Sequence, residues 1–360
     1  HGRVEQKALR QAVQLADPRY GDVVLDVDVK PNRGDGLSLV GLAREVSAVT
    51  GAPVRFPDSD PVEGATAVAD RLRVEVLRDD LCPRFVGRWV GGVTVGPSPD
   101  RIQMRLIAAG LRPVSNVVDV SNYVMLELGK PIHTFDAAVV RDGHLIVRLA
   151  AVGERLETLD HVERELTDDT LLIADPQGPL AIAGVMGGAS SEISAATTDV
   201  VIESAIFDPV SIRRTAFRYA LRSEASLRFE KGQEHRLARM GADRSARLIA
   251  EWAGGEVASG VIDTDPIEPA PAQVAFRPAR IDRLLGTSLG ADEQRALLTR
   301  VGITTQAAPK GTAVPVAAGP RPFVIEPGHD AVVLATVPSW RRDLVIEADV
   351  AEEVARIRGY

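Results

Sequence analysis

The chain has 360 residues and a formal net charge of -8 at pH 7, and 45% of its residues are hydrophobic. A chain of this length is expected to hold two or three domains, because about 150 residues per domain is usual. No stretch approaches the roughly 18 uninterrupted apolar residues of a membrane helix. The first ten residues are too polar for a secretory signal, and a single cysteine, Cys82, excludes an intramolecular disulfide and a cysteine-rich zinc site. We therefore expect a cytoplasmic protein with several domains and no membrane partner.

The first predicted elements are a strand, a loop and a helix. Hydrophobic alternation predicts a half-buried strand over residues 22–29, and the stretch KPNRGDG then interrupts the chain. A helical pattern follows over residues 37–51, where Gly51 is placed to end the helix. Residues 57–64 are typical of a linker. Strands are predicted over residues 71–77 and 84–95, and a helix over residues 98–110, with Ser98 as its N-cap.

The middle of the chain mixes helices and strands without regular alternation. The stretch NVVDVSNYVMLELGKPIHTFD, residues 116–136, predicts a core strand running into a helix, although Ser121, Asn122 and His133 interrupt its apolar residues. Short β-rich segments continue to about residue 207, and helices are predicted over residues 211–221 and 235–255. Residues 263–273 are rich in proline and acidic residues, which indicates a domain boundary. The fold class expected from this pattern is α+β.

The two ends of the chain contain related segments. PNRGD with GLAREVSAVTG near the start resembles PSWRRD with DVAEEVARIRG at the end. The spacing from Asp35 to Glu45 and Gly51 equals that from Asp343 to Glu353 and Gly359. Two such distant copies indicate a duplicated module of a loop leading into a helix rather than a repeat array.

Three polar or glycine positions in the middle have competing interpretations. Glu203 lies in the apolar run VVIESAIF, where an unpaired charge is unfavourable, so it requires a partner or a ligand. His133 can be a site residue or a structural histidine near a turn. The glycines of GVMGG, which begins with Gly184, lack the lysine of a phosphate-binding loop and are equally compatible with a tight turn.

Charged clusters suggest two further sites. Between residues 211 and 240 eight basic residues face only three acidic ones in a chain that is acidic as a whole, which predicts either a phosphate-binding face or a solvated, salt-bridged helix pair. The four basic residues that begin this stretch are Arg213, Arg214, Arg218 and Arg222. Near the end, Asp349 with Glu352 fits a capping box. The same carboxylates together with Asp343 and Glu353 could instead bind Mg²⁺.

Five segments together resemble the β subunit of bacterial phenylalanine-tRNA ligase. They are GLRPVSNVVDVSNYVMLELGKPIHTFD, LAIAGVMGG, IESAIFDPVSIRRTA, LRSEASLRFEKG and PSWRRDLVIEADVAEEVARIRGY, in the order of the family. The resemblance implies a B1-like winged-helix-like segment over residues 1–65, a mixed α/β editing domain of the B3/B4 type over 66–262, a linker over 263–273 and a B5 domain over 274–360. The two flanking domains would be of the DNA-binding winged-helix type, and the chain an internal fragment between an OB-fold domain and a catalytic-like domain.

The resemblance also implies a function. This fragment would hydrolyse mischarged Tyr-tRNA(Phe), in support of aminoacylation by an α2/β2 assembly with the α subunit and tRNA(Phe). ATP would be used only by the full complex. The editing residues implied are Ser121, Asn122, His133, Gly184, Glu203 and Ala225, and the Mg²⁺ shared with the α subunit would be held by Asp343, Asp349, Glu352 and Glu353.

Several positions depart from the family pattern. Ser121 stands where the family usually has threonine, Ser223-Glu224-Ala225 replaces a common Thr-Asp-Ala, and Lys30 replaces a threonine before PNR. The alternative function is a binding module that has lost hydrolysis and serves as an RNA-binding or subunit scaffold.

Overall fold

The computed structural model describes residues 25–308, 313–314, 323–324 and 332–360. The chain divides into two compact units, which we describe separately. The first unit contains Pro57–Ile267 with the described residues up to Val29, and the second combines Lys30–Phe56 with Glu268–Tyr360. No helix within the described ranges is long and apolar enough to span a membrane.

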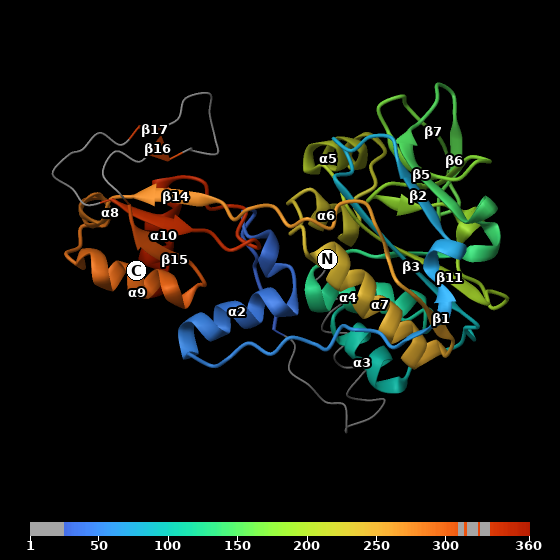
Figure 1. Cartoon of the computed structure of the whole chain (residues 1–360), viewed down its shortest axis with the longest axis horizontal. Helices are drawn as coiled ribbons and strands as arrows, with labels where there is room; N and C mark the ends of the chain where they lie inside the picture. Colours follow the sequence, from blue (N-terminus) through green and yellow to red (C-terminus); the bar gives the residue numbers. More distant parts are fainter. Residues whose placement is uncertain (1–24, 309–312, 315–322, 325–331) are drawn as a thin grey trace. The chain divides into compact units, whose positions relative to one another are not determined.

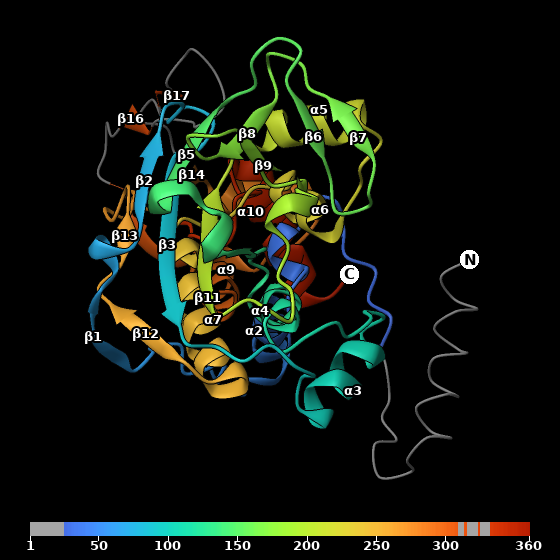
Figure 2. The same ribbon diagram turned by 90° about the vertical axis from the view of Figure 1, so that its right-hand side faces the viewer.

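Two sheets form the framework of the first unit (Figures 1 and 2). The six-stranded sheet has the order β1-β12-β3-β11-β4, and β13 also pairs with β3. Its strands are β1 (Glu63–Ala67), β12 (Glu256–Ser259), β3 (Arg84–Gly91), β11 (Asp199–Ile206), β4 (His133–Asp136) and β13 (Ile262–Asp263). The five-stranded sheet has the order β10-β9-β8-β5-β2. Its strands are β10 (Met186–Gly187), β9 (Pro179–Ile182), β8 (Leu171–Ala174), β5 (His144–Leu149) and β2 (Arg73–Val76).

Short elements complete the first unit. β6 (Arg155–Glu157) and β7 (Glu163–Glu165) form an antiparallel pair. The helices are α3 (Asp100–Ala108), α4 (Val118–Leu128), α5 (Pro209–Arg218), α6 (Glu224–Phe229) and α7 (Leu237–Ala253). Single 3₁₀ turns lie at Val68–Asp70, Ala137–Val139, Arg141–Gly143 and Ala189–Ser191.

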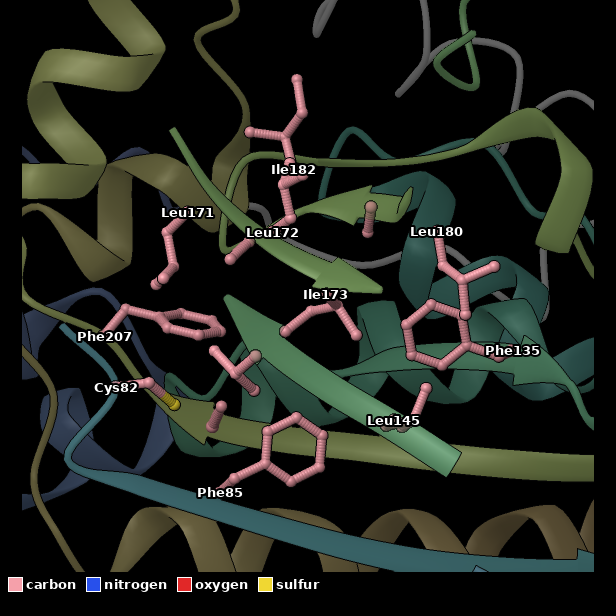
Figure 3. Packing of buried hydrophobic residues seen from close by; sticks show 14 of the residues in the cluster. Cys82, Phe85, Phe135, Leu145, Leu171, Leu172, Ile173, Leu180, Ile182 and Phe207 are labelled. Carbon is pink, nitrogen blue, oxygen red and sulfur yellow. The ribbon is translucent and has the colours of Figure 1, made fainter. Parts of the chain in front are cut away.

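Opposite faces of the six-stranded sheet have different neighbours. Along β11, Val201 and Ala205 point into the main core, where Phe85 and Phe135 meet Leu145 and Ile173 of the five-stranded sheet (Figure 3). The alternate residues face the other way, where Ile206 packs with small residues of α7. Because successive strand residues point to opposite faces, Glu203 shares the face of Val201 and Ala205.

The second unit is a three-stranded sheet with helices. Its strand order is β14-β18-β15, with β14 (Gln273–Phe276), β18 (Val333–Thr336) and β15 (Thr304–Ala307), and a separate pair is formed by β16 (Ala313–Val314) and β17 (Phe323–Val324). The helices are α2 (Leu39–Thr50), α8 (Pro278–Leu285), α9 (Gly290–Arg300) and α10 (Glu347–Arg358), and a 3₁₀ turn precedes α2 at Gly34–Gly36. Ala48 of α2 lies in one core with Leu298 and Val350 of the C-terminal segment.

That shared core changes the predicted division of the chain. The sequence placed residues 1–65 and 274–360 in two separate flanking domains, but residues 30–56 belong to the same unit as the C-terminal segment. The α2 helix buries Ala48 there, and Arg300 of α9 donates from Nε to the Ala48 carbonyl at 2.8 Å. Residues 1–24 lie outside the described residues, and the winged-helix character of these segments stays a prediction.

The duplicated module is present as two copies of a loop that leads into a helix, and both copies have the same set of ion pairs. Arg33 donates to Asp35 two residues later and to Glu45 twelve residues later, and Arg341 repeats both contacts with Asp343 and Glu353. Both helices that follow, α2 and α10, have 12 residues. Arg356 joins the copies because it contacts both Glu45 and Glu353. We call the following seven residues the arginine cluster: Arg33, Asp35, Glu45, Arg341, Asp343, Glu353 and Arg356.

Two predicted elements differ from the structure. Residues 25–29 of the predicted strand 22–29 form no strand, and Leu25 and Val27 are exposed; residues 22–24 lie outside the described residues. Residues 116–136 form a helix followed by a strand, the reverse of the predicted order. The helix α4 is buried on one side by Val120, Val124 and Leu128, and an apolar run alone does not distinguish such a helix from a core strand.

Candidate functional site

Glu203 lies in the middle of β11, between β3 and the edge strand β4, with its side chain in the apolar interior. The strand β11 holds it between Gly87 of β3 and His133 of β4. Its β-branched neighbours favour a strand, and the side chain is only 6% exposed. Among the described residues no group donates a hydrogen bond to the Glu203 carboxylate. Burial raises the pKa of Glu203 to about 7, and the positive charge of Lys130 opposes that rise.

His133 is the cross-strand partner of Glu203. Its ring packs edge-to-face against Phe135 with the ring centroids 4.5 Å apart. Burial lowers the pKa of His133 to about 4, so the imidazole is neutral near pH 7. On β10, a Cβ on Gly187 would lie 2.5 Å from Cε1 of His133, so only glycine fits beside this ring. The site predicted around His133 therefore includes β10 as well as β4 and β11.

Ser121 and Asn122 lie on α4, which leads directly into the site. The helix ends at Leu128, and Gly129, with φ of +80°, turns the chain toward Lys130 and β4. Both side chains are half-buried, and the Ser121 hydroxyl has no hydrogen-bond partner among the described residues. Neighbouring Asn116 differs, since its amide binds the Thr94 and Trp252 carbonyls at 3.0 Å.

Gly184 and Ala225 belong to two elements that are fastened together. Gly184 has φ of +66°, and a Cβ there would lie 2.9 Å from carbons of Ile212 and Phe207, so a side chain is excluded on both grounds. Ser223, the N-cap of α6, donates from Oγ to the Val185 carbonyl at 3.0 Å. This bond ties the helix that carries Ala225 to the Gly184 turn.

Lys130 is a site residue that the sequence analysis did not single out. Its side chain is fully buried, and Nζ donates to the Ala205 carbonyl and lies 4.7 Å from the Phe229 ring centroid. Burial lowers its pKa to about 7, while Glu203 counteracts that shift. The available signal was a charge inside an otherwise apolar run, GKPIHTF, which is the argument that identified Glu203.

These contacts bring most of the predicted editing residues into one region. Glu203 and His133 are partners on adjacent strands, and Lys130 acts electrostatically on Glu203. The Lys130 ammonium also lies over the Phe229 ring, which packs near the Gly184 turn. Ser121 and Asn122 lie on α4, which leads into β4, and Ala225 lies on α6, which Ser223 ties to the Gly184 turn. Buried polar groups in native proteins normally have partners, so a group of them without protein partners indicates a binding site.

The basic residues at the start of the predicted phosphate-binding stretch fall into two classes. Arg213 and Arg214 are exposed on α5 and form no ion pair with any described residue. Arg218 forms an ion pair with Asp169, and Arg222 forms one with Glu230, with 3.1 Å between Nη2 and Oε1. Of these four arginines, only Arg213 and Arg214 have guanidinium groups without an acidic partner among the described residues.

The four C-terminal carboxylates have protein donors or solvent as neighbours in this structure, and the Mg²⁺ site shared with the α subunit stays a prediction. Asp343 and Glu353 accept hydrogen bonds from Arg341, at 2.8 Å and 2.7 Å, and Glu352 is exposed. Asp349 accepts from the backbone N–H groups of Val345 and Ile346, both at 2.8 Å. No group of three or more His, Cys, Asp or Glu side chains in the described ranges is arranged to hold a metal ion. For Asp343 and Glu353, the Arg341 guanidinium supplies positive charge beside the carboxylates.

The predicted capping box is displaced by one turn. The sequence paired Asp349 as cap with Glu352, but α10 begins at Glu347, so Asp349 is its third residue and reaches back to Ile346. The carboxylate thus satisfies N–H groups at the start of the helix, where the helix dipole also favours negative charge.

Comparison with known proteins identifies two domain families. Residues 81–254 match the family model of the B3/4 domain, and residues 274–360 match that of the tRNA synthetase B5 domain. The phenylalanine–tRNA ligase beta subunit of Moorella thermoacetica is 46% identical over 339 residues, 94% of this chain and 40% of that protein. The protein of the same name from Rhodopirellula baltica is 44% identical over 344 residues, 94% of this chain and 47% of that protein. The chain thus spans less than half the length of these two relatives.

A solved N-terminal fragment of the phenylalanyl-tRNA synthetase beta subunit from Pyrococcus horikoshii aligns with 99% of this chain and 98% of its own, at 16% identity and a TM-score of 0.41. A score this low does not establish a shared fold. The assignment to a family rests instead on the two domain matches and on relatives that align with 94% of the chain. By these matches the chain belongs to the phenylalanine–tRNA ligase beta-subunit family.

Proposed function

We propose that the first unit hydrolyses Tyr-tRNA(Phe), the product of mistaken tyrosine attachment. The single observation that carries this proposal is the Glu203 carboxylate, which is buried in the sheet interior without a hydrogen-bond donor from any described residue. A tyrosine hydroxyl would supply the missing donor. Phenylalanine lacks that hydroxyl and would leave the buried acceptor unpaired, so the site favours tyrosine.

A second site for tyrosine is physically reasonable because the two amino acids differ by one hydroxyl. An apolar synthetic pocket rejects an added hydroxyl only about a hundredfold, whereas a site built to bind the hydroxyl discriminates far better. The relatives named above are ligases for phenylalanine and tRNA, which makes a tyrosyl ester the relevant wrong product. Separate hydrolysis would then remove what the synthetic pocket admits.

Hydrolysis of an aminoacyl ester does not require a strong nucleophile from the protein. An aminoacyl ester is activated, and holding it in the correct orientation beside a water contributes much of the rate acceleration. The hydroxyl of Ser121, the amide of Asn122 and the neutral imidazole of His133 are polar groups that can orient the ester and the water. The Gly184 backbone would contact the phenol group of the tyrosine together with Glu203. Ala225 would line the pocket beside the amino acid.

We further propose that the chain acts within an assembly with the ligase α subunit and binds tRNA(Phe) partly through Arg213 and Arg214. In that assembly the α subunit would carry the ATP-dependent synthetic step. The second candidate function, a binding module without hydrolysis, is favoured by these two exposed guanidinium groups, because they can neutralise phosphates whether or not a reaction follows.

Deacylation of Tyr-tRNA(Phe) and Phe-tRNA(Phe) by the purified chain, and by the chain assembled with the α subunit, tests the proposal. We expect faster release of tyrosine than of phenylalanine, with release of tyrosine strongest in the assembly. Equal rates for the two esters would refute selection by Glu203. Salt-sensitive tRNA binding without release of either amino acid would favour the binding module.

A further inference from the structure

The surroundings of Lys130 are those of a cation held inside the protein. The side chain is fully buried, its Nζ donates to the Ala205 carbonyl, and the face of the Phe229 ring lies 4.7 Å away. Both a carbonyl oxygen and an aromatic face attract positive charge. On the side of α7, a Cβ on Gly241 would lie 2.6 Å from Cγ of Lys130, so that helix has a glycine where the lysine stem passes.

The negative group within the field of Lys130 is Glu203. Ala205, whose carbonyl accepts the hydrogen bond from Lys130, stands two residues after Glu203 on the same face of β11. Each charge shifts the pKa of the other toward its ionised form, against the effect of burial. The two side chains form no direct ion pair within the described part of the chain, so the Glu203 oxygens remain available to a ligand.

The other charged or titratable groups around the pair are already compensated or neutral. Arg84 of β3 is paired with Asp263, with 2.8 Å between Nη2 and Oδ2. Asp243 of α7 binds Arg88. Burial and the nearby Glu203 raise the pKa of the Cys82 thiol, and burial keeps His133 neutral near pH 7. Lys130 is therefore the uncompensated positive group beside Glu203 among the described residues.

We propose that Lys130 is a positioning residue whose buried ammonium group keeps Glu203 in its carboxylate form, as the acceptor for the substrate hydroxyl. This inference rests on the proposed function for the identity of the substrate but concerns the charge of Glu203 itself. Only the carboxylate is a pure acceptor; a protonated carboxyl group can also donate a hydrogen bond and would bind the hydroxyl less selectively.

Energetics favour a functional reason for this lysine. Burying an ammonium group is unfavourable unless carbonyls or opposite charges compensate it, and an apolar side chain of similar length would pack at lower cost. Removing the ammonium would leave the desolvation of Glu203 unopposed. The carboxyl would then stay protonated to higher pH, and selection of tyrosine would weaken near neutral pH.

Two substitutions separate charge from packing. Lys130→Gln removes the charge but keeps an N–H donor for the Ala205 carbonyl, and Lys130→Met removes both. The carboxyl stretch of Glu203, identified by subtracting the infrared spectrum of Glu203→Gln, reports its protonation directly. In both lysine variants we expect Glu203 to ionise at a pH roughly one unit or more higher than in wild type. This is the effect of losing a neighbouring opposite charge.

A second readout is the ratio of Tyr-tRNA to Phe-tRNA hydrolysis as a function of pH. Near neutral pH the ratio should fall roughly tenfold in Lys130→Gln, as a one-unit pKa change implies, and recover as pH rises. In the Glu203→Gln background the same lysine change should have no further effect on the ratio. A lysine that only stabilised the fold would lower both rates together at every pH.

The outcomes distinguish this inference from the proposed function. An unchanged ionisation of Glu203 in folded Lys130→Gln would overturn the role of Lys130 while leaving editing possible. A shifted ionisation without hydrolysis of either ester would support Lys130 as the counter-charge and remove the editing function. If both lysine variants fail to fold, ¹⁵N-lysine resonances of wild type and Glu203→Gln decide: Lys130 should lose its proton at lower pH in Glu203→Gln, and an unchanged pH would overturn the proposal.

Discussion

Two buried glutamates, Glu203 in the first unit and Glu353 in the second, have opposite surroundings. In the arginine cluster of the second unit, Arg341 binds both Asp343 and Glu353, and Arg356 binds Glu353 as well as Glu45. In the first unit Glu203 is equally buried but receives no hydrogen bond from the described residues, and the Ser121 hydroxyl is without a partner. The first arrangement is complete in itself, and the second has unused hydrogen-bonding capacity.

The partners of a buried carboxylate indicate whether it stabilises the fold or remains available to a ligand. A carboxylate with guanidinium partners stabilises architecture, as Glu353 does where two copies of a module meet, and its pKa falls to about 2 because Arg341 and Arg356 outweigh its burial. A carboxylate without such partners has its pKa raised by burial, as Glu203 does, and is available to a ligand. The two buried glutamates thus differ both in their partners and in the direction of their pKa shifts, and this difference motivates the functional proposal for Glu203.

The largest effect is expected from Arg341→Met. Removing a buried guanidinium group leaves Asp343 and Glu353 without their principal partner, which typically costs about 3–5 kcal/mol. Denaturant unfolding should show this loss in the free energy of unfolding of the second unit. The matched control is Arg33→Met in the other copy, where the side chain is 13% exposed against 2% for Arg341. Equal losses for the two variants would mean that burial does not set the importance of the cluster.

Acid should weaken the same cluster. The folded-state pKa of Glu353 lies below its ordinary value of 4.5, at about 2. A depressed pKa means that the stabilisation is fully present above the unfolded-state value and is lost as pH falls from about 4.5 toward 2. The loss should be on the order of 2–3 kcal/mol, measured as denaturation midpoints against pH. Glu353→Gln should flatten that dependence, and an unaltered curve would contradict the assignment.

Glu203→Gln should alter selectivity while retaining the fold. The amide keeps the shape of the carboxylate but removes its charge, so hydrolysis of Tyr-tRNA(Phe) should fall by about 1.5–3 kcal/mol in transition-state stabilisation, roughly tenfold to a hundredfold. Hydrolysis of Phe-tRNA(Phe) should change little. In wild type the preference for tyrosine should increase as pH rises through about 7, where Glu203 loses its proton. A large drop in melting temperature instead would make Glu203 structural.

His133→Ala should lower the rate for both esters by roughly tenfold, since an imidazole that positions the ester or water acts on the shared backbone of the substrates. Because its pKa is lowered to about 4, His133 is neutral throughout the range in which Glu203 titrates. The pH at which tyrosine selectivity appears should therefore be the same in wild type and His133→Ala. An unchanged rate would leave His133 as a packing partner of Phe135.

The smallest effect is expected at the surface of α5. Charge reversal of Arg213 or Arg214 should weaken tRNA binding by about 1 kcal/mol and reduce its salt dependence, because each free guanidinium can neutralise one phosphate. Arg218→Glu is the matched control, since Arg218 is held by Asp169. Binding measured at several salt concentrations should rank the control below the two free arginines. A larger effect at Arg218 would reverse the distinction between paired and free residues.

The sequence by itself determined the local features of this protein. The patterns over residues 37–51 and 235–255 predicted helices that the structure places at Leu39–Thr50 and Leu237–Ala253, and Gly51 ends the first with φ of +76°. Helical periodicity and terminal glycines act through neighbouring residues, so one segment contains all that is needed. The equal spacing around Asp35 and Asp343 likewise revealed the duplicated module, and a charge in an apolar run identified Glu203.

Only the tertiary structure decided which distant segments meet. It paired the two module copies in one unit, reversed the predicted order of helix and strand in residues 116–136, and placed His133 opposite Glu203. It also distinguished paired from free arginines, and brought the buried Lys130 into the field of Glu203. Strand partners, ion pairs and desolvation depend on residues far away in the chain, so no local pattern specifies them. A carboxylate can cap a helix, bind an arginine or bind a ligand, and its neighbours in space determine which of these roles it has.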